Sequence, residues 1–228
     1  DPMASLDPLF SIYDQVGEPA CHHRRLRRNS LKTRVEELLG MVRIPSPSIR
    51  MKEFPHQMSG GMRQRIVGAM ALAGGPKLIV ADEPTTNLDV TIQLQYLELL
   101  KELQDQTGVA LIFVTHNLGI VAKMCNQIAV MYAGKIVEQG TTRDIFNQPQ
   151  HPYTDALLKS IPVLGNKDPL YVIPGQPPNL AEPPDGCLFH PRCPKADQRC
   201  RVEHPPEVVL QNAQTSVCWM THKEQQLV

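Results

Sequence analysis

The chain has 228 residues, of which 42% are hydrophobic, and its 23 Lys and Arg residues balance its 23 Asp and Glu residues. This length and apolar content allow one large domain or two small ones with a real core. The balanced charge argues against a nucleic-acid-binding protein, which normally carries a basic excess. Neither an 18-residue apolar run, which would predict a membrane-spanning helix, nor a signal-peptide pattern is visible in the sequence.

The first 75 residues predict helices. Residues 1–20 are expected to form a loop that leads into a helix, and the basic run at 22–29 is expected to be a solvent-exposed face. Apolar residues at 35, 38, 39 and 42 follow helical spacing and predict an amphipathic helix that ends before Pro45. Ser59 is the expected N-cap of a further helix, which ends at the two glycines before Pro76.

The hydrophobic period then changes to that of alternating strands and helices. Short apolar runs predict buried strands, and the segments between them predict helices; the strands are expected at 77–82, 109–116 and 128–134, and the helices at 91–108 and 117–125. The last strand is expected to turn back at Ala133 and Gly134. The alternation of strands and helices is typical of an α/β fold with a parallel sheet.

The composition changes near residue 145. Thirteen of the 21 prolines and four of the six cysteines lie after residue 140. Proline is excluded from helix interiors and central strands, so two more helices (142–149 and 151–161) are expected to lead into a Pro-rich tail. We therefore predict a helical subdomain at 1–75, a sheet-containing part at 76–145 and a C-terminal extension at 146–228.

The chemistry is concentrated in residues 58–116. The expected strand at 77–82 delivers Asp82 and Glu83 to its carboxyl end, where α/β sheets bind ligands. Asp82 is suited to bind Mg²⁺ on a nucleotide phosphate, and Glu83 to polarise an attacking water as a general base. Before this strand, Ser59, Gly60 and Gly61 open a helix whose N-terminal N–H groups attract an anion.

Four sequence strings in series resemble the ABC transporter ATPase family: MSGGMRQR (58–65), LIVADEP (78–84), TTNLD (85–89) and VTHN (114–117). They correspond to the signature loop, Walker B, the D-loop and the switch histidine. The resemblance implies that Ser59, Gly60 and Gly61 contact ATP held by an opposite subunit. It also implies that His116 senses the γ-phosphate and that Asp89 bridges two subunits.

The opening DPMASLDP and the segment HPYTDALL (151–158) narrow the resemblance to the ATPases of dipeptide, oligopeptide and nickel importers. Asn87 and Asn117 depart from the usual alanine and aspartate of the family. No Gly-x-x-x-x-Gly-Lys-Ser/Thr occurs in the 228 residues, so we expect an incomplete P-loop NTPase core that lacks Walker A and is a fragment of a longer ATPase.

The resemblance implies ATP and Mg²⁺ as ligands, and a second ABC ATPase subunit and integral membrane permease subunits as partners. A peptide-binding protein would take part indirectly, and no nucleic acid is expected. The subunit would lie peripherally on the cytoplasmic face of the membrane. Two alternatives stay open, which are a soluble ABC ATPase outside transport and a non-catalytic remnant that serves a partner's nucleotide site.

Cys187, Cys193, Cys200 and Cys218 form a separate candidate site in the Pro-rich tail. A cytosolic location disfavours disulfides, and the spacing lacks the tight Cys-x-x-Cys pairs of most zinc sites. Four thiolates without a histidine suit an iron–sulfur cluster, and the resemblance implies a [4Fe–4S] cluster there. Zinc and the absence of any metal remain alternatives. Cys21 and Cys125 lie outside this group.

Overall fold

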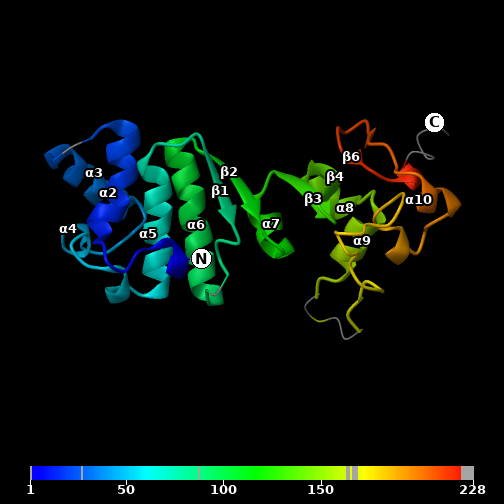
Figure 1. Ribbon diagram of the computed structural model, residues 1–228, viewed down its shortest axis with the longest axis horizontal. Helices are drawn as coiled ribbons and strands as arrows, with labels where there is room; N and C mark the ends of the chain where they lie inside the picture. The colour runs from blue at the N-terminus through cyan, green and yellow to red at the C-terminus, as the bar shows by residue number, and fades with distance from the viewer. Residues whose placement is uncertain (1, 27, 87, 163–164, 166–168, 222–228) are drawn as a thin grey trace. The chain divides into compact units, whose positions relative to one another are not determined.

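The computed structural model describes residues 2–26, 28–86, 88–162, 165 and 169–221, and Asn87 lies outside this description. The chain divides into two compact units, Asp1–His116 and Asn117–Val228, which we describe separately (Figure 1). The domain boundaries expected near residues 75 and 145 stay a prediction, because this division reflects spatial contact and not independent folding.

The first unit is mainly helical. Its helices are α1 (Pro2–Ser5), α2 (Ile12–Arg24), α3 (Arg28–Met41), α4 (Pro47–Arg50), α5 (Gly60–Ala73) and α6 (Val90–Thr107), with a 3₁₀ turn at Pro55–Gln57. Helices α2, α3 and α5 pack against one another around a buried core. The predicted apolar stripe on α3 is confirmed, because Val35, Leu38, Leu39 and Val42 are all fully buried.

Helix α2 begins earlier than the sequence predicted, since residues 12–20 were expected to be a loop. Ser11 and Asp14 start it with a reciprocal capping box, and Pro19 lies inside it. An interior proline costs a helix about 3 kcal/mol. Burial of apolar side chains such as Ile12 and Val16, each worth roughly 1.5–3 kcal/mol, outweighs that cost.

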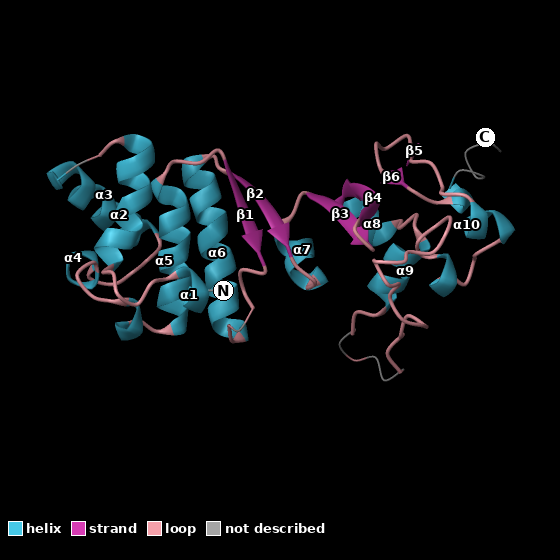
Figure 2. Cartoon of the chain, viewed as in Figure 1, coloured by secondary structure: helices cyan, strands magenta, loops and turns pink. Residues whose placement is uncertain are grey.

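Strands β1 (Leu78–Asp82) and β2 (Ala110–Val114) form a parallel pair in which Asp82 lies opposite Val114 (Figure 2). This pair confirms the predicted parallel sheet for two of its three expected strands. The third, expected at 128–134, lies instead in a separate antiparallel sheet, because it turns back into a hairpin. One face of the pair lies against α5 and α6, and it includes Ile79, Ala81 and Leu111. Both strands end at the same edge, so the pair places the predicted site residues together at its carboxyl end.

The second unit combines short helices with an antiparallel sheet. Its elements are α7 (Leu118–Met124), β3 (Gln127–Tyr132), β4 (Lys135–Thr141), α8 (Thr142–Asn147), α9 (Pro152–Lys159), a 3₁₀ turn at His190–Arg192, α10 (Gln198–Val202), β5 (Val208–Val209) and β6 (Thr215–Ser216). The strand order is β3-β4-β6-β5. The predicted turn at Ala133 and Gly134 is confirmed, with φ angles of 47° and 77°. Strand β3 is therefore hydrogen-bonded to β4 as a hairpin.

The tail is anchored by one aromatic side chain. Phe189 is 1% exposed and packs against Tyr132 and Tyr153, with ring centroids 5.2 and 5.4 Å away. This contact inserts the tail into the core of the β3–β4 hairpin. In the part of the chain that the structure describes, no helix is both long enough and apolar enough to cross a membrane.

Candidate functional site

Glu83 and His116 meet just beyond the carboxyl ends of β1 and β2. His116 Nδ1 lies 2.8 Å from Glu83 Oε1, and the Thr86 hydroxyl donates to Glu83 Oε2 at 2.9 Å. Because a carboxylate only accepts, His116 is the donor through Nδ1. These two hydrogen bonds hold the Glu83 carboxylate in place. The Glu83 side chain is still 44% exposed and that of His116 81% exposed, so the carboxylate is open to a ligand.

The Glu83 carboxylate is held in its ionised form. Its pKa is lowered first by the hydrogen bond from His116 and then by that from Thr86. The backbone of Glu83 turns sharply, with a φ of 43°, while its N–H donates to the Val114 carbonyl at 2.8 Å. A positive φ is unfavourable for a glutamate, and such strain is concentrated at functional sites.

Ser59 and Asp89 both cap helices. The Ser59 hydroxyl accepts the Met62 N–H at 3.3 Å at the start of α5. Asp89 Oδ1 accepts the N–H groups of Thr91 and Ile92, each at 3.0 Å, at the start of α6. Both residues thus have a structural role within the chain, in addition to any role toward a ligand.

The two glycines at the start of α5 differ in their surroundings. A Cβ at Gly61 would lie 3.2 Å from Ile92, so the chain's own packing favours glycine there. A Cβ at Gly60 would meet no heavy atom of the described chain within 4 Å. Among the described residues, space is therefore open beside Gly60 in the direction of its missing side chain.

Two links join the helices to the loop after β1. Gln64 on α5 donates to the buried Pro84 carbonyl at 2.8 Å, and Gln93 on α6 donates to the Thr85 hydroxyl at 3.1 Å. Among the described residues, the Ser59 hydroxyl bonds within its own helix turn, and the Glu83 carboxylate bonds to Thr86 and His116. The structure thus brings Glu83 and His116 together and connects the signature helix to them through Pro84.

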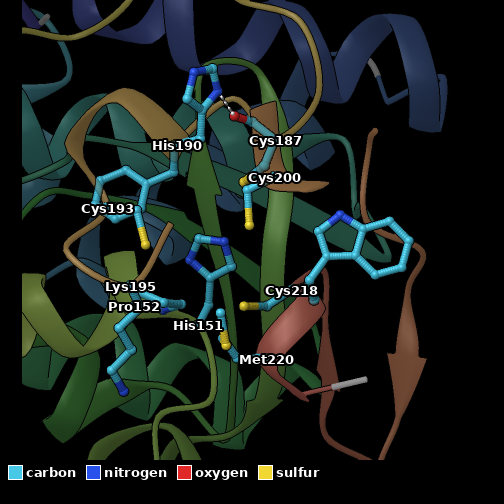
Figure 3. Close-up of a pocket in the computed structure, with 11 residues that line it drawn as sticks. His151, Pro152, Cys187, His190, Cys193, Lys195, Cys200, Cys218 and Met220 are labelled. Atoms are coloured by element: carbon cyan, nitrogen blue, oxygen red, sulfur yellow. Dashed lines mark hydrogen bonds between the residues drawn. The ribbon is translucent and has the colours of Figure 1, made fainter. Parts of the chain in front are cut away.

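The four cysteines of the tail line one pocket in the second unit. Cys187, Cys193, Cys200 and Cys218 surround it together with His151 and His190 (Figure 3). Cys200 and Cys218 are buried, and the other two are half-buried. Residues separated by up to 31 positions in the sequence therefore line one pocket, and their role as a common ligand set stays a prediction.

Burial favours the neutral form of three thiols in this pocket, those of Cys187, Cys193 and Cys200. Burial, with smaller contributions from the neighbouring thiols, raises the pKa of Cys187 to about 11. Burial also raises the pKa values of Cys193 and Cys200. Among the described residues, no three His, Cys, Asp or Glu side chains are arranged to hold a single metal ion.

Two family models match the chain. The model described as "ABC transporter" matches residues 4–86, and the model described as "Oligopeptide/dipeptide transporter, C-terminal region" matches residues 137–200. The chain is 49% identical to the dipeptide transport ATP-binding protein DppD of Bacillus subtilis over 96% of its own length and 66% of that protein. For DppD of Escherichia coli the identity is 46%, over 96% of this chain and 67% of that protein.

The chain belongs to the ABC transporter ATP-binding protein family. It is also 46% identical to the oligopeptide transport ATP-binding protein OppD of Bacillus subtilis, over 98% of this chain and 63% of that protein. A solved structure of cbiO1 from Clostridium perfringens, part of the ABC transporter complex cbiONQ, shares the fold with a TM-score of 0.57 and 29% identity, over 65% of this chain and 57% of that one. The chain spans about two thirds of the length of the curated relatives it matches.

Family membership implies ATP and Mg²⁺ as ligands. The structure also gives roles to residues that the motif strings contain without assigning them a role. Thr86 holds the second oxygen of Glu83, and Gln64 joins α5 to Pro84. His151 enters the cysteine pocket, although the sequence had suggested a site without histidine. The position of His151 directly before a proline that starts a helix signals its N-cap role but not its place in the pocket.

Proposed function

We propose that this chain is the ATP-hydrolysing subunit of an ABC importer for di- or oligopeptides. The observation that carries the proposal is the Glu83–His116 hydrogen bond at the carboxyl edge of the parallel pair. The match to the oligopeptide and dipeptide transporter C-terminal region supports a peptide as cargo. The names of the DppD and OppD relatives support the same cargo.

In this proposal Glu83 is the general base. Its ionised carboxylate accepts a hydrogen bond from the attacking water, and His116 and Thr86 keep the carboxylate in position. His116 would also contact the γ-phosphate through Nε2 as an imidazolium, in which both ring N–H groups donate, because Nδ1 already donates to Glu83. Asp82, one residue earlier at the strand end, would hold Mg²⁺, which supplies charge neutralisation on the phosphates.

The start of α5 serves a second subunit. Ser59, Gly60 and Gly61 would bind the γ-phosphate of ATP held by a partner ATPase subunit, and the open space at Gly60 supports this assignment. Asp89 would bridge the two subunits while it caps α6. The pair would lie peripherally on the cytoplasmic face of the membrane and drive permease subunits, with a peptide-binding protein as an indirect partner.

The test separates the two carboxylates in an ATPase in which these residues follow a Walker A segment. We expect Glu83→Gln to bind ATP with Mg²⁺ normally and to lose turnover by about 100-fold or more, because only the general base is removed. We expect Asp82→Asn to weaken Mg²⁺-dependent ATP binding itself. Affinity and phosphate release are measured separately, and identical phenotypes of the two variants would contradict the assignment.

The four tail cysteines would hold a [4Fe–4S] cluster. Four thiols converging on one pocket supply the donor set for a cluster, which binds one cysteine at each iron. A single zinc ion needs its sulfurs within about 3.8 Å of one another, given Zn–S bonds of about 2.3 Å. No group that could hold a metal ion is found among the described residues, so the support for a cluster is the convergence of the four cysteines on one pocket.

The pocket has a volume of about 10 Å³, which is room for about one water molecule. A cluster needs more room than this, so the tail would have to fold around it, and its binding would contribute to folding. We expect Cys200→Ser to cost both the metal and protease resistance of the tail, and Cys21→Ser, the control, to cost neither.

Iron, sulfide and zinc analysis of anaerobically purified protein provides the measurement, together with visible absorption. Stoichiometric zinc without iron would replace the cluster by a zinc site. A metal-free tail that still resists protease would refute both kinds of site.

A further inference from the structure

The side chain of His151 lies inside the cysteine pocket. It is 2% exposed and lines the pocket together with all four cysteines, and Figure 3 shows its imidazole among their side chains. The residue belongs to the loop between α8 and α9 and is the N-cap of α9. It therefore reaches the pocket from a part of the chain that precedes Cys187, the first of the four pocket cysteines, by 36 positions.

The hydrogen bonds of His151 determine which ring nitrogen carries the proton. Its Nδ1 accepts the backbone N–H of Tyr153 at 3.0 Å. A nitrogen that accepts carries no proton, so the neutral ring has its proton on Nε2. The histidine is consequently a donor through the nitrogen that its helix cap leaves unused.

The orientation of this ring is fixed from three sides. Its backbone N–H donates to Glu138 Oε2 at 2.9 Å, and its ring packs against Phe189 with a centroid distance of 5.9 Å. The contact to Tyr153 ties the ring to the first turn of α9. Rotation of the ring would break the helix cap, so the ring is preorganised where it lines the pocket.

We propose that His151 donates its Nε2–H to a sulfur of the bound cluster and thereby raises the reduction potential of the cluster. The inference rests on the cluster of the proposed function. A hydrogen bond to sulfur stabilises the more negative, reduced cluster, which shifts the potential upward. His151 is a positioning and tuning residue, since the four cysteines already supply the ligand set.

His190 offers a matched comparison within the same pocket. Its Nδ1 lies 3.0 Å from the Cys187 carbonyl, and because a carbonyl only accepts, Nδ1 carries the proton. The Nε2 of a neutral His190 ring is then without a proton and has nothing to donate to sulfur. The two histidines line one pocket with opposite tautomers, so their replacement is expected to have different effects.

The experiment uses the 228-residue chain, purified anaerobically, with the variants His151→Asn and His190→Asn. Asparagine is a strong N-cap, so the first variant keeps an acceptor for the Tyr153 N–H and removes the ring donor. Iron and sulfide content is measured first, and the potential is then obtained from a reductive titration followed by EPR. We expect His151→Asn to keep its iron and to show a more negative potential, and His190→Asn to show a smaller change.

A second measurement does not depend on whether the variant folds. Pulsed EPR of reduced wild-type protein with ¹⁵N-labelled histidine is expected to show a weak nitrogen coupling, transmitted through the hydrogen bond. No coupling, or the strong coupling of a directly bound nitrogen, would overturn the proposal. An unchanged potential in an iron-loaded His151→Asn variant would do the same and leave the cluster standing. Wild-type protein without iron and sulfide would overturn the cluster and this inference together.

Discussion

The Glu83 carboxylate depends on Thr86 for one of its two hydrogen bonds. We expect Thr86→Val, which keeps the shape and removes the hydroxyl, to raise the pKa of Glu83 toward its usual 4.5. The sign follows because hydrogen bonds to the ionised form lower a carboxyl pKa. A lowered folded-state pKa favours folding above pH 4.5, and this contribution is lost as the pH falls through the folded value.

Carboxyl NMR titration of the wild type and the variant measures this shift. Thr91→Val is the control, because Thr91 lies in the first turn of α6, whereas the hydroxyl that donates to Glu83 is that of Thr86. An unchanged titration of Glu83 in Thr86→Val would show that His116 alone sets the pKa.

At the level of single residues, the sequence motifs predicted the pair Glu83 and His116 but not the position of His151, which depends on tertiary contacts. The spacing of 33 residues between Glu83 and His116 was enough to expect them at one sheet edge, and they form a hydrogen bond there. His151 was not expected near the cysteines. Its place in the pocket follows from tertiary contacts to Glu138 and Phe189, which no local pattern in the sequence encodes.

At the level of elements, the turn of the β3–β4 hairpin has a residue, Ala133, whose replacement is expected to stabilise the protein. Ala133 and Gly134 both have positive φ, as a two-residue type I′ turn requires, and such turns favour Asn-Gly. We expect Ala133→Asn to stabilise the protein by about 0.5–1 kcal/mol, since asparagine tolerates the left-handed region better than alanine. Urea unfolding gives the measurement.

The matched variant for this turn is Gly134→Ala, which introduces a side chain at a φ of 77° and is expected to destabilise. Equal stability of both variants would contradict the turn geometry.

Elements with strong local signals, such as this turn and the stripe on α3, were predictable. Helix α2 was not, because the burial that outweighs Pro19 depends on distant partners.

At the level of the whole second unit, one buried carboxylate joins three segments. Glu138 is fully buried and accepts hydrogen bonds from the Gln150 N–H at 2.6 Å, the His151 N–H at 2.9 Å and the Gln214 amide at 2.7 Å. All three partners are donors, so Glu138→Gln would bring an amide N–H against one of them. We expect a loss of about 2–3 kcal/mol, in the range for hydrogen bonds to buried charged groups.

Chemical denaturation followed by Trp219 fluorescence measures this loss, because Trp219 is the single tryptophan and lies in the same unit. Glu207→Gln, at an exposed position, serves as the control and is expected to change little. A Glu138→Gln protein as stable as the control would show that the network adds no net stability.

The same network has a consequence for the order of events during synthesis. Gln214 is translated 76 residues after Glu138. At a synthesis rate of 5–20 residues per second, the carboxylate waits roughly 4–15 s for this partner. During that interval the hairpin and α9 have formed only part of the arrangement that buries the charge. The nascent chain therefore passes through a stage in which its C-terminal unit stays open to proteases and chaperones until the last strand arrives.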